Sequence, residues 1–95
     1  MAEEWKLVFH LKAKKLLKEF QTDELDRIEE ALEKLSLMEL EELDIKKLEG
    51  LKDPYNRDVF RVKVSRDIRI LVSFDPENRH VHVWRIARRE SVYDV

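Results

Sequence analysis

The sequence predicts an α+β fold in which an N-terminal strand and a helical hairpin pack on one face of a small antiparallel sheet, in the order β-α-α-β-β-β. Two observations predict it: apolar residues recur at helical spacing in the first half of the chain and alternate with polar residues in the second half. The length of 95 residues supports one hydrophobic core, so we expect a single domain over residues 1–95.

The first elements are a strand and two helices. Residues 5–9, Trp-Lys-Leu-Val-Phe, are typical of a short strand. A helix is expected over residues 11–20, and a second one with Thr22 as its N-cap, acidic residues in its first turn, and an end near Leu37. The apolar faces comprise Ala13, Leu16, Leu17 and Phe20 in the first helix and Leu25, Ile28, Leu32 and Leu35 in the second.

Residues 38–50 fit two interpretations. Leu40, Leu43, Ile45 and Leu48 can extend the second helix, whereas Gly50 and Pro54 mark a change of path by the early fifties.

Three alternating segments follow, over residues 59–65, 68–74 and 80–86. Residues 65–67 are short enough to join the first two as a hairpin, and residues 75–78 have the composition of a turn. In the last segment, alternation places His82, Trp84 and Ile86 on one face. The helical hairpin would cover one side of the sheet, which leaves Arg61, Lys63 and Arg69 on the opposite side.

Charge is distributed unevenly. Residues 1–50 carry 9 basic and 14 acidic residues, a net −5, whereas residues 51–95 carry 10 and 7, a net +3. An arginine-rich half on an acidic protein indicates a local site for phosphate or carboxylate groups, and the alternative is an ordinary solvated face.

Composition also excludes several classes of protein. There is no cysteine, which excludes disulfides and cysteine-based metal sites or nucleophiles. The three histidines, His10, His80 and His82, are few and scattered, so we expect no metal site and no cofactor. No apolar run is long enough to span a membrane or to act as a signal peptide, so we expect a cytoplasmic protein with no membrane partner.

Three segments in this order carry a resemblance to a known family. They read LDIKKLEGL (residues 43–51), FRVKVSRDIRILVSF (residues 60–74) and RIARRESVYDV (residues 85–95). Together they resemble the RelE branch of the RelE/ParE toxin superfamily, whose members cleave messenger RNA in the ribosomal decoding site with basic residues and without a metal. The resemblance covers about half of the chain by motif and nearly all of it by the order of elements.

The resemblance implies roles for individual residues. Arg61 and Lys63 match a basic pair, one member of which helps to activate the ribose 2′-hydroxyl, and Arg69 matches an arginine that contacts the phosphate. Arg89, or its neighbour Arg88, matches a basic residue of the tail, and Tyr93 matches a tyrosine that stacks on a base or assists proton transfer. Arg85 and Arg88 would add RNA-binding charge. The chemistry is consistent, because attack by the substrate's own hydroxyl needs charge stabilisation at phosphorus and no protein nucleophile.

The resemblance also implies partners: a RelB-like antitoxin that wraps the toxin, the ribosome with its mRNA, and an assembly of two toxin–antitoxin pairs.

Two residues depart from the family pattern, since Ile68 stands where tyrosine is usual and Arg88 where many relatives have histidine. Two alternatives therefore remain: a ParE-like inhibitor of DNA gyrase, and a RelE-fold scaffold without activity.

Overall fold

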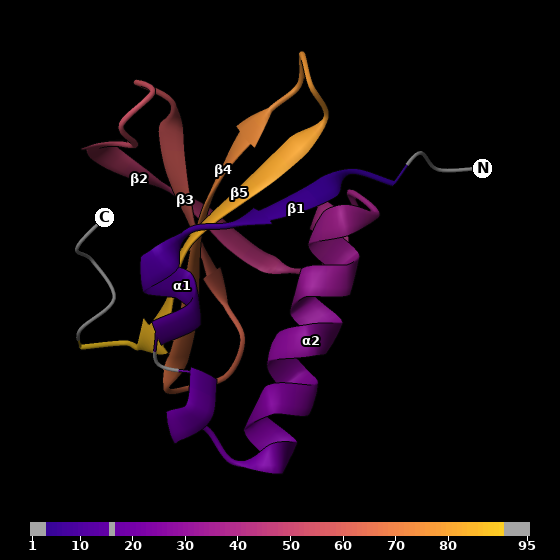
Figure 1. Ribbon diagram of the computed structural model, residues 1–95, viewed down its shortest axis with the longest axis vertical. Coiled ribbons are helices and arrows are strands. Elements are labelled where there is room, and N and C mark those ends of the chain that lie inside the picture. Colours follow the sequence, from indigo (N-terminus) through magenta and orange to yellow (C-terminus); the bar gives the residue numbers. More distant parts are fainter. Residues whose placement is uncertain (1–3, 16, 91–95) are drawn as a thin grey trace.

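The computed structural model describes residues 4–15 and 17–90, in which one strand is followed by a helical segment and then by four strands (Figure 1). Among these residues no helix has the length and apolar character that crossing a bilayer requires. In chain order the elements are β1 (Lys6–Phe9), α1 (Leu11–Lys15), the 3₁₀ turn η1 (Leu17–Glu19), α2 (Thr22–Ser36), the 3₁₀ turn η2 (Leu40–Glu42), β2 (Asp44–Lys52), β3 (Asp58–Lys63), β4 (Ile68–Asp75) and β5 (His80–Arg88).

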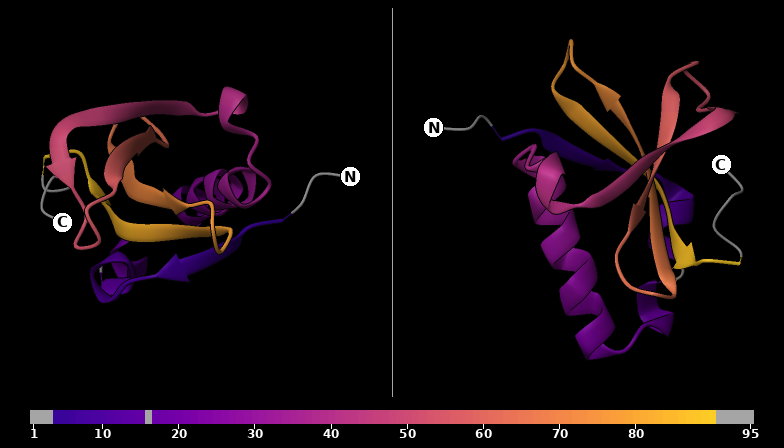
Figure 2. Two further views of the ribbon diagram at one scale, coloured as in Figure 1. Left: turned by 90° about the horizontal axis from the view of Figure 1, so that it is seen from above. Right: turned by 180° about the vertical axis from the view of Figure 1, so that it is seen from behind.

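The five strands form one sheet in the order β1-β5-β4-β3-β2. Neighbouring strands from β2 to β5 are antiparallel, but β1 runs parallel to β5, with Lys6 opposite His80 and Phe9 opposite Val83. The sheet is therefore mixed, and the expectation of a purely antiparallel sheet is wrong for its first strand. The chain must cross from one edge of the sheet to the other after β1, and the helical segment makes this crossing (Figure 2).

The main hydrophobic core lies between α2 and one face of the sheet, which we call the helix face. Ile28 and Leu35 of α2 pack there against inward residues of the central strands, and all are at most 2% exposed. The inward strand residues include Val62, Ile70, Val72, Val83 and Ile86. The predicted helical hairpin over one face is thus confirmed, with a first helix that is shorter than expected.

The start of α2 differs by one residue from the prediction. Gln21, and not Thr22, is the N-cap, and its backbone N–H donates to Glu24 Oε1 at 2.9 Å. This contact satisfies one backbone donor just outside the helix, as in a capping box.

The ambiguous segment, residues 38–50, begins with the 3₁₀ turn η2 and continues from Asp44 as strand β2, which is antiparallel to β3. Its half-buried residues Ile45, Leu48 and Leu51 are spaced three apart, which imitates a helix. The cause is an irregularity in pairing between Lys47 and Lys52, where Gly50 adopts a φ of +78°. The extra residues break the alternation of faces that identifies a strand in a sequence.

A second irregularity lies in β5. Leu71 is paired with Arg85 and Val72 with Val83, so Trp84 is an inserted residue. Trp84 and Arg85 consequently lie on the same side of the sheet, whereas Ile86 returns to the helix face. The expectation that His82, Trp84 and Ile86 share a face is therefore wrong for Ile86.

Candidate active site

The face of the sheet opposite α2, which we call the open face, carries four of the predicted site residues. Arg61 and Arg85 are both paired with Leu71, one from each side, and Lys63 is paired with Arg69 in the next row. Directly paired residues on one face have Cβ atoms about 5 Å apart. The structure thus gathers Arg61, Lys63, Arg69 and Arg85 into one basic strip across β3, β4 and β5.

The β5 bulge is what adds Arg85 to this strip. Without the extra residue at Trp84, alternation from His82 onwards would turn Arg85 toward the helix face. Because bulges redirect side chains in this way, one inserted residue determines whether the strip contains an arginine from β5.

An acidic residue of β2, Asp44, borders the strip at its β2 edge. Arg61 Nη2 lies 3.5 Å from Asp44 Oδ1, and the Arg61 side chain is 16% exposed. Lys63, which is paired with the same aspartate in the sheet, is exposed. A partly shielded arginine beside an exposed lysine can present two cations to a single phosphate group.

Arg69 was expected to contact the phosphate, but its guanidinium is bonded to backbone carbonyls. Its residue is 8% exposed, and its Nη1 donates to the backbone carbonyls of Ser65 at 2.7 Å, Arg66 at 3.2 Å and Ile68 at 3.2 Å. The first two carbonyls belong to the turn between β3 and β4, and the third is at the start of β4. Arg69 therefore holds this turn, and through it the end of β3 that carries Lys63.

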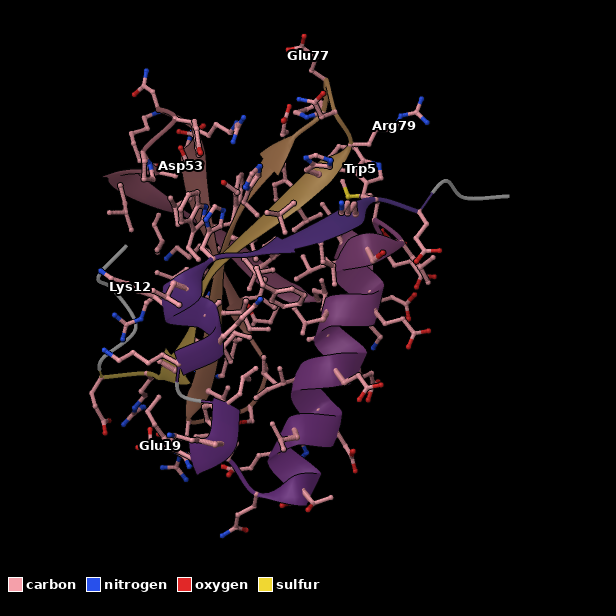
Figure 3. The ribbon with its side chains drawn as sticks, in the orientation of Figure 1. Trp5, Lys12, Glu19, Asp53, Glu77 and Arg79 are labelled. Atoms are coloured by element: carbon pink, nitrogen blue, oxygen red, sulfur yellow. The ribbon has the colours of Figure 1, made fainter. Side chains whose placement is uncertain are left out.

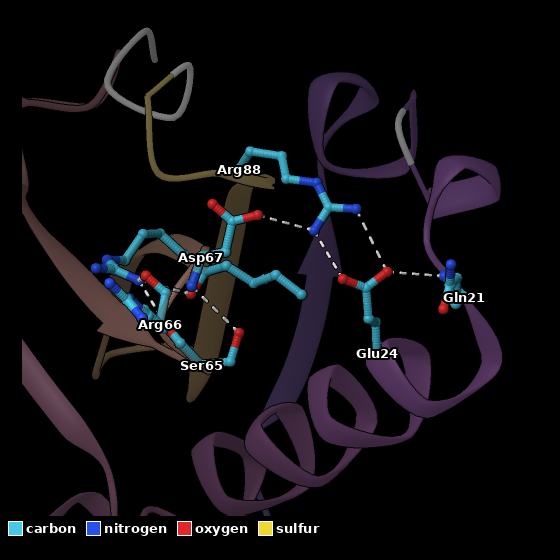
Figure 4. A network of polar contacts seen from close by, with 8 residues as sticks. Gln21, Glu24, Ser65, Arg66, Asp67 and Arg88 are labelled. Atoms are coloured by element: carbon cyan, nitrogen blue, oxygen red, sulfur yellow. Dashed lines mark hydrogen bonds and ion pairs between the residues drawn. The ribbon is translucent and has the colours of Figure 1, made fainter.

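Arg88 is paired with Ile68 and lies on the helix face, where it contacts Glu24 and Asp67 (Figure 4). Its Nη1 is 2.7 Å from Glu24 Oε2 and 3.1 Å from Asp67 Oδ2, and its guanidinium lies over the Phe20 ring at 5.0 Å. The hydrogen bond with Arg88 lowers the pKa of Glu24, and the same bond raises the pKa of Arg88. These contacts tie the start of α2 to the β3–β4 turn and to the end of β5.

The tail residues are only partly described. Arg89 is exposed, and its backbone N–H donates to Asp67 O at 2.8 Å. Tyr93 lies outside the described residues.

The other end of the open face carries a buried polar cluster that the sequence analysis missed. Asp53, at the end of β2 (Figure 3), accepts a hydrogen bond from Ser73 Oγ at 2.5 Å, and Ser73 in turn accepts one from Trp84 Nε1 at 2.9 Å. Asp53 Oδ1 also accepts the backbone N–H groups of Tyr55 at 2.8 Å and Arg57 at 2.9 Å. These bonds fix the loop between β2 and β3 over the sheet. The Asp53-Pro54 pair marks a turn in the sequence, but nothing there indicates its partner Ser73.

The histidines also meet at this end, so the expectation that they are scattered is wrong. Because β1 lies beside β5, His10 reaches His82, with His10 Nε2 2.9 Å from His82 Nδ1. The His10 ring stacks on Trp84 with centroids 3.6 Å apart. Burial lowers the pKa of both His10 and His82, and for His82 the nearby Arg57 lowers it further. Both imidazoles are therefore neutral at pH 7.

The surface of the described residues contains hollows, two of which are lined mainly by apolar atoms. One, of about 340 Å³, lies beside the stacked rings and is lined by His10, Leu11, Lys12, Pro54 and Trp84. The other, of about 460 Å³, lies between β1 and α2. Its apolar lining is Leu7, Phe9, Leu32 and Leu37, and it is accompanied by the acidic residues Glu4, Glu29 and Glu33.

Sequence comparison alone identifies no relative, since no family model matches and no curated protein matches. Solved structures do match. The archaeal RelE–RelB complex from Pyrococcus horikoshii OT3 contains a chain that is 21% identical, with a TM-score of 0.74 over 97% of this chain and 100% of that one. A metal-bound toxin from Helicobacter pylori gives 0.70 at 15% identity, over 94% and 99% of the two chains. The toxin–antitoxin complex RelBE2 from Mycobacterium tuberculosis gives 0.65 at 21% identity, over 90% and 99%. The chain therefore has a RelE-like toxin fold.

Proposed function

We propose that this chain is the toxin of a type II toxin–antitoxin pair and that it cleaves mRNA on the ribosome as a metal-independent endoribonuclease in the cytoplasm. The observation that carries the proposal is the basic strip, which occupies the open face of a fold found in solved toxin–antitoxin complexes. The strip places cations from three neighbouring strands on one surface, as recognition of an RNA backbone requires.

The proposed reaction is an internal transfer within the RNA. The ribose 2′-oxygen attacks the adjacent phosphorus, the bond from phosphorus to the 5′-oxygen breaks, and the proton lost by the 2′-hydroxyl is balanced by one gained on the leaving 5′-oxygen. Arg61 and Arg85 stabilise the negative charge that builds on the phosphoryl oxygens, and Lys63 helps to activate the 2′-hydroxyl. Arg69 acts as a positioning residue through the β3–β4 turn. Arg89 and Tyr93 would contact the RNA from the tail, and Arg88 joins them only if it leaves Glu24.

The proposal is tested by translation-coupled cleavage. Purified protein is added to ribosomes stalled with a codon in the decoding site, and cuts are mapped by primer extension. Arg61→Ala is expected to slow cleavage about 100- to 1,000-fold, as the loss of one charge-stabilising donor typically does. Arg79→Ala is the matched control, because Arg79 is an exposed arginine of the β4–β5 turn, at the opposite end of β4 from Arg69. Lys63→Ala and its exposed counterpart Lys18→Ala form a second pair.

The outcomes separate the candidates. Cuts that disappear in the strip variants but persist in the controls support the nuclease. Intact message from folded wild-type protein, together with inhibition of gyrase supercoiling, would replace it with the ParE-like alternative. Intact message with no effect on gyrase would leave an inactive scaffold.

A RelB-like antitoxin is the partner we propose for the groove between β1 and α2. The groove combines an apolar lining with Glu4, Glu29 and Glu33, so it fits an amphipathic segment whose apolar side is flanked by Lys or Arg. Glu29→Lys combined with Glu33→Lys should weaken the complex with the co-expressed cognate antitoxin, whereas Glu41→Lys, an exposed acid in η2, should not. Equal affinity for both variants would place the antitoxin elsewhere. Light scattering of the complex would test the proposed heterotetramer.

A further inference from the structure

Three potential metal ligands meet where β4 ends and β5 begins. Asp75 and His80 are paired across the hairpin, and His82 lies two residues further along β5. Residues two apart in a strand point to the same side, so all three side chains share the open face. One donor atom from each residue can be chosen so that all three lie within 4.8 Å of one another. Donors at this separation can converge on a single ion at about 2 Å from each after small side-chain rotations.

The imidazole ring of His82 is held in place by a hydrogen bond with His10, as the ring of a metal-binding histidine usually is. Its Nδ1 is 2.9 Å from His10 Nε2, which leaves Nε2 as the nitrogen for another interaction. The residue is 8% exposed, and among the described residues Nε2 has no hydrogen-bond partner although it is buried. A buried polar atom without a partner is unfavourable and rare, so the unpaired Nε2 indicates that His82 binds a ligand. In a metal-binding histidine, the ring nitrogen that does not bind the metal typically makes a hydrogen bond that fixes the ring, as Nδ1 of His82 does with His10.

Asp75 has one oxygen restrained and one more accessible to a ligand. Its Oδ2 accepts a hydrogen bond from Asn78 Nδ2 at 2.8 Å and lies 3.3 Å from Arg57 Nη2. Its Oδ1 receives only a long contact of 3.4 Å from the Asn78 backbone N–H. Hydrogen bonding by Asn78 lowers the pKa of Asp75, so the carboxylate is charged at neutral pH. A carboxylate fixed through its second oxygen is again typical of metal sites.

We propose that Asp75, His80 and His82 bind one Zn²⁺-like transition metal ion, with water as the fourth ligand. Two imidazole nitrogens and one carboxylate oxygen are a donor set that Zn²⁺ accepts, whereas Ca²⁺ and Mg²⁺ prefer oxygen ligands alone. The ion would join β4 to β5 at the opposite end of the open face from Lys63 and Arg69. It would therefore stabilise the hairpin and need not take part in RNA cleavage.

Arg57 supplies an internal test of this assignment. Its guanidinium, beside Asp75, repels a dication and competes for the carboxylate. Arg57→Gln should therefore bind the metal more tightly than the wild type. Non-specific binding to a surface histidine would not respond in this way.

The experiment uses tag-free, chelator-treated full-length protein titrated with ZnCl₂ by calorimetry and with Co²⁺ by visible absorption. We expect one ion per chain and an increase in thermal midpoint with Zn²⁺. His80→Ala should lose more than about 100-fold in affinity, because removing a group that merely orients a ligand already costs about 10- to 100-fold. His80 is half-buried at the start of β5, and circular dichroism verifies that the variant folds.

Glu77→Gln is the matched control, since Glu77 is an exposed acid at the tip of the same hairpin (Figure 3) and lies outside the ligand set. It should bind Zn²⁺ as the wild type does. The proposal is overturned if folded wild type shows no stoichiometric binding, or if folded His80→Ala binds as tightly as Glu77→Gln.

Discussion

Replacing Ser73 with alanine tests the buried polar cluster that fixes the β2–β3 loop. Ser73 is fully buried and lies between two partners, since it donates to Asp53 Oδ2 and accepts from Trp84 Nε1. Ser73→Ala leaves a buried indole N–H without its acceptor and removes one donor from a carboxylate whose side chain is 0% exposed. An unsatisfied buried donor costs about 1–3 kcal/mol, and a hydrogen bond to a charged group contributes about 1.5–3 kcal/mol.

The two effects together predict a loss of about 2.5–6 kcal/mol in the free energy of unfolding. Ser36→Ala is the matched control: Ser36 is 7% exposed, and its Oγ donates to a single backbone carbonyl, that of Trp5, at 2.7 Å. Its loss should cost about 1–3 kcal/mol, the penalty for one unsatisfied buried group.

Urea unfolding monitored by circular dichroism measures both variants. If the difference between wild type and Ser73→Ala is no larger than that for Ser36→Ala, Ser73 does not link Asp53 to Trp84 in solution and the reasoning fails. For a domain of this size each kcal/mol corresponds to about 4–8 °C in melting temperature, so a melting curve also resolves the two.

Three further predictions concern the core, a turn and an ion pair. Leu35→Ala, at a position 0% exposed, should destabilise the protein by about 2–5 kcal/mol in urea unfolding, while a loss under 1 kcal/mol would show that α2 is not packed as described. Gly50→Ala should cost about 1–2 kcal/mol in the same assay, because a φ of +78° is unfavourable for a residue with a Cβ. No atom lies within 4 Å of the added Cβ, so no steric clash adds to this cost, and a neutral result would mean that the bulge relaxes. Glu24, whose pKa is lowered by Arg88, stabilises the folded state above its ordinary pKa of 4.5, and this contribution is lost as pH falls through the lower folded-state value. The stability difference between wild type and Glu24→Gln should therefore shrink on acidification below about 4.5, and acid titration that leaves the difference constant would exclude the ion pair as its source.

The elements that follow a single periodicity were predictable from the sequence. The repeat of Ile28, Leu32 and Leu35 gave α2, and alternation in residues 59–74 gave β3, β4 and the face of Arg61, Lys63 and Arg69. The sequence analysis did not identify strand β2, and it misplaced the facing of residues late in β5; both strands contain an inserted residue or an irregular pairing. In β2 the irregularity spaced apolar residues three apart, and in β5 the bulge at Trp84 exchanged the faces of the residues after it.

The candidate site was predictable to the same extent. Local alternation was enough to group Arg61 with Lys63, but the meeting of His10 with His82 depends on which strand lies beside β1. Arg88 was expected to face RNA, yet it pairs with Glu24, 64 residues earlier in the chain. Contacts between residues so far apart are set by topology, which no local pattern encodes.

The parallel pairing of β1 with β5 also affects how the chain is made. The partner of Lys6 is His80, so 74 residues must be added after Lys6 before this pair can form. At synthesis rates of about 5–20 residues per second, the wait is roughly 4–15 s. During this time the strand that contains Leu7 and Phe9 has no partner in the sheet, and it is exposed to chaperones and to other nascent chains. The sheet closes only when one of the last segments to be synthesised is inserted between the first strand and β4.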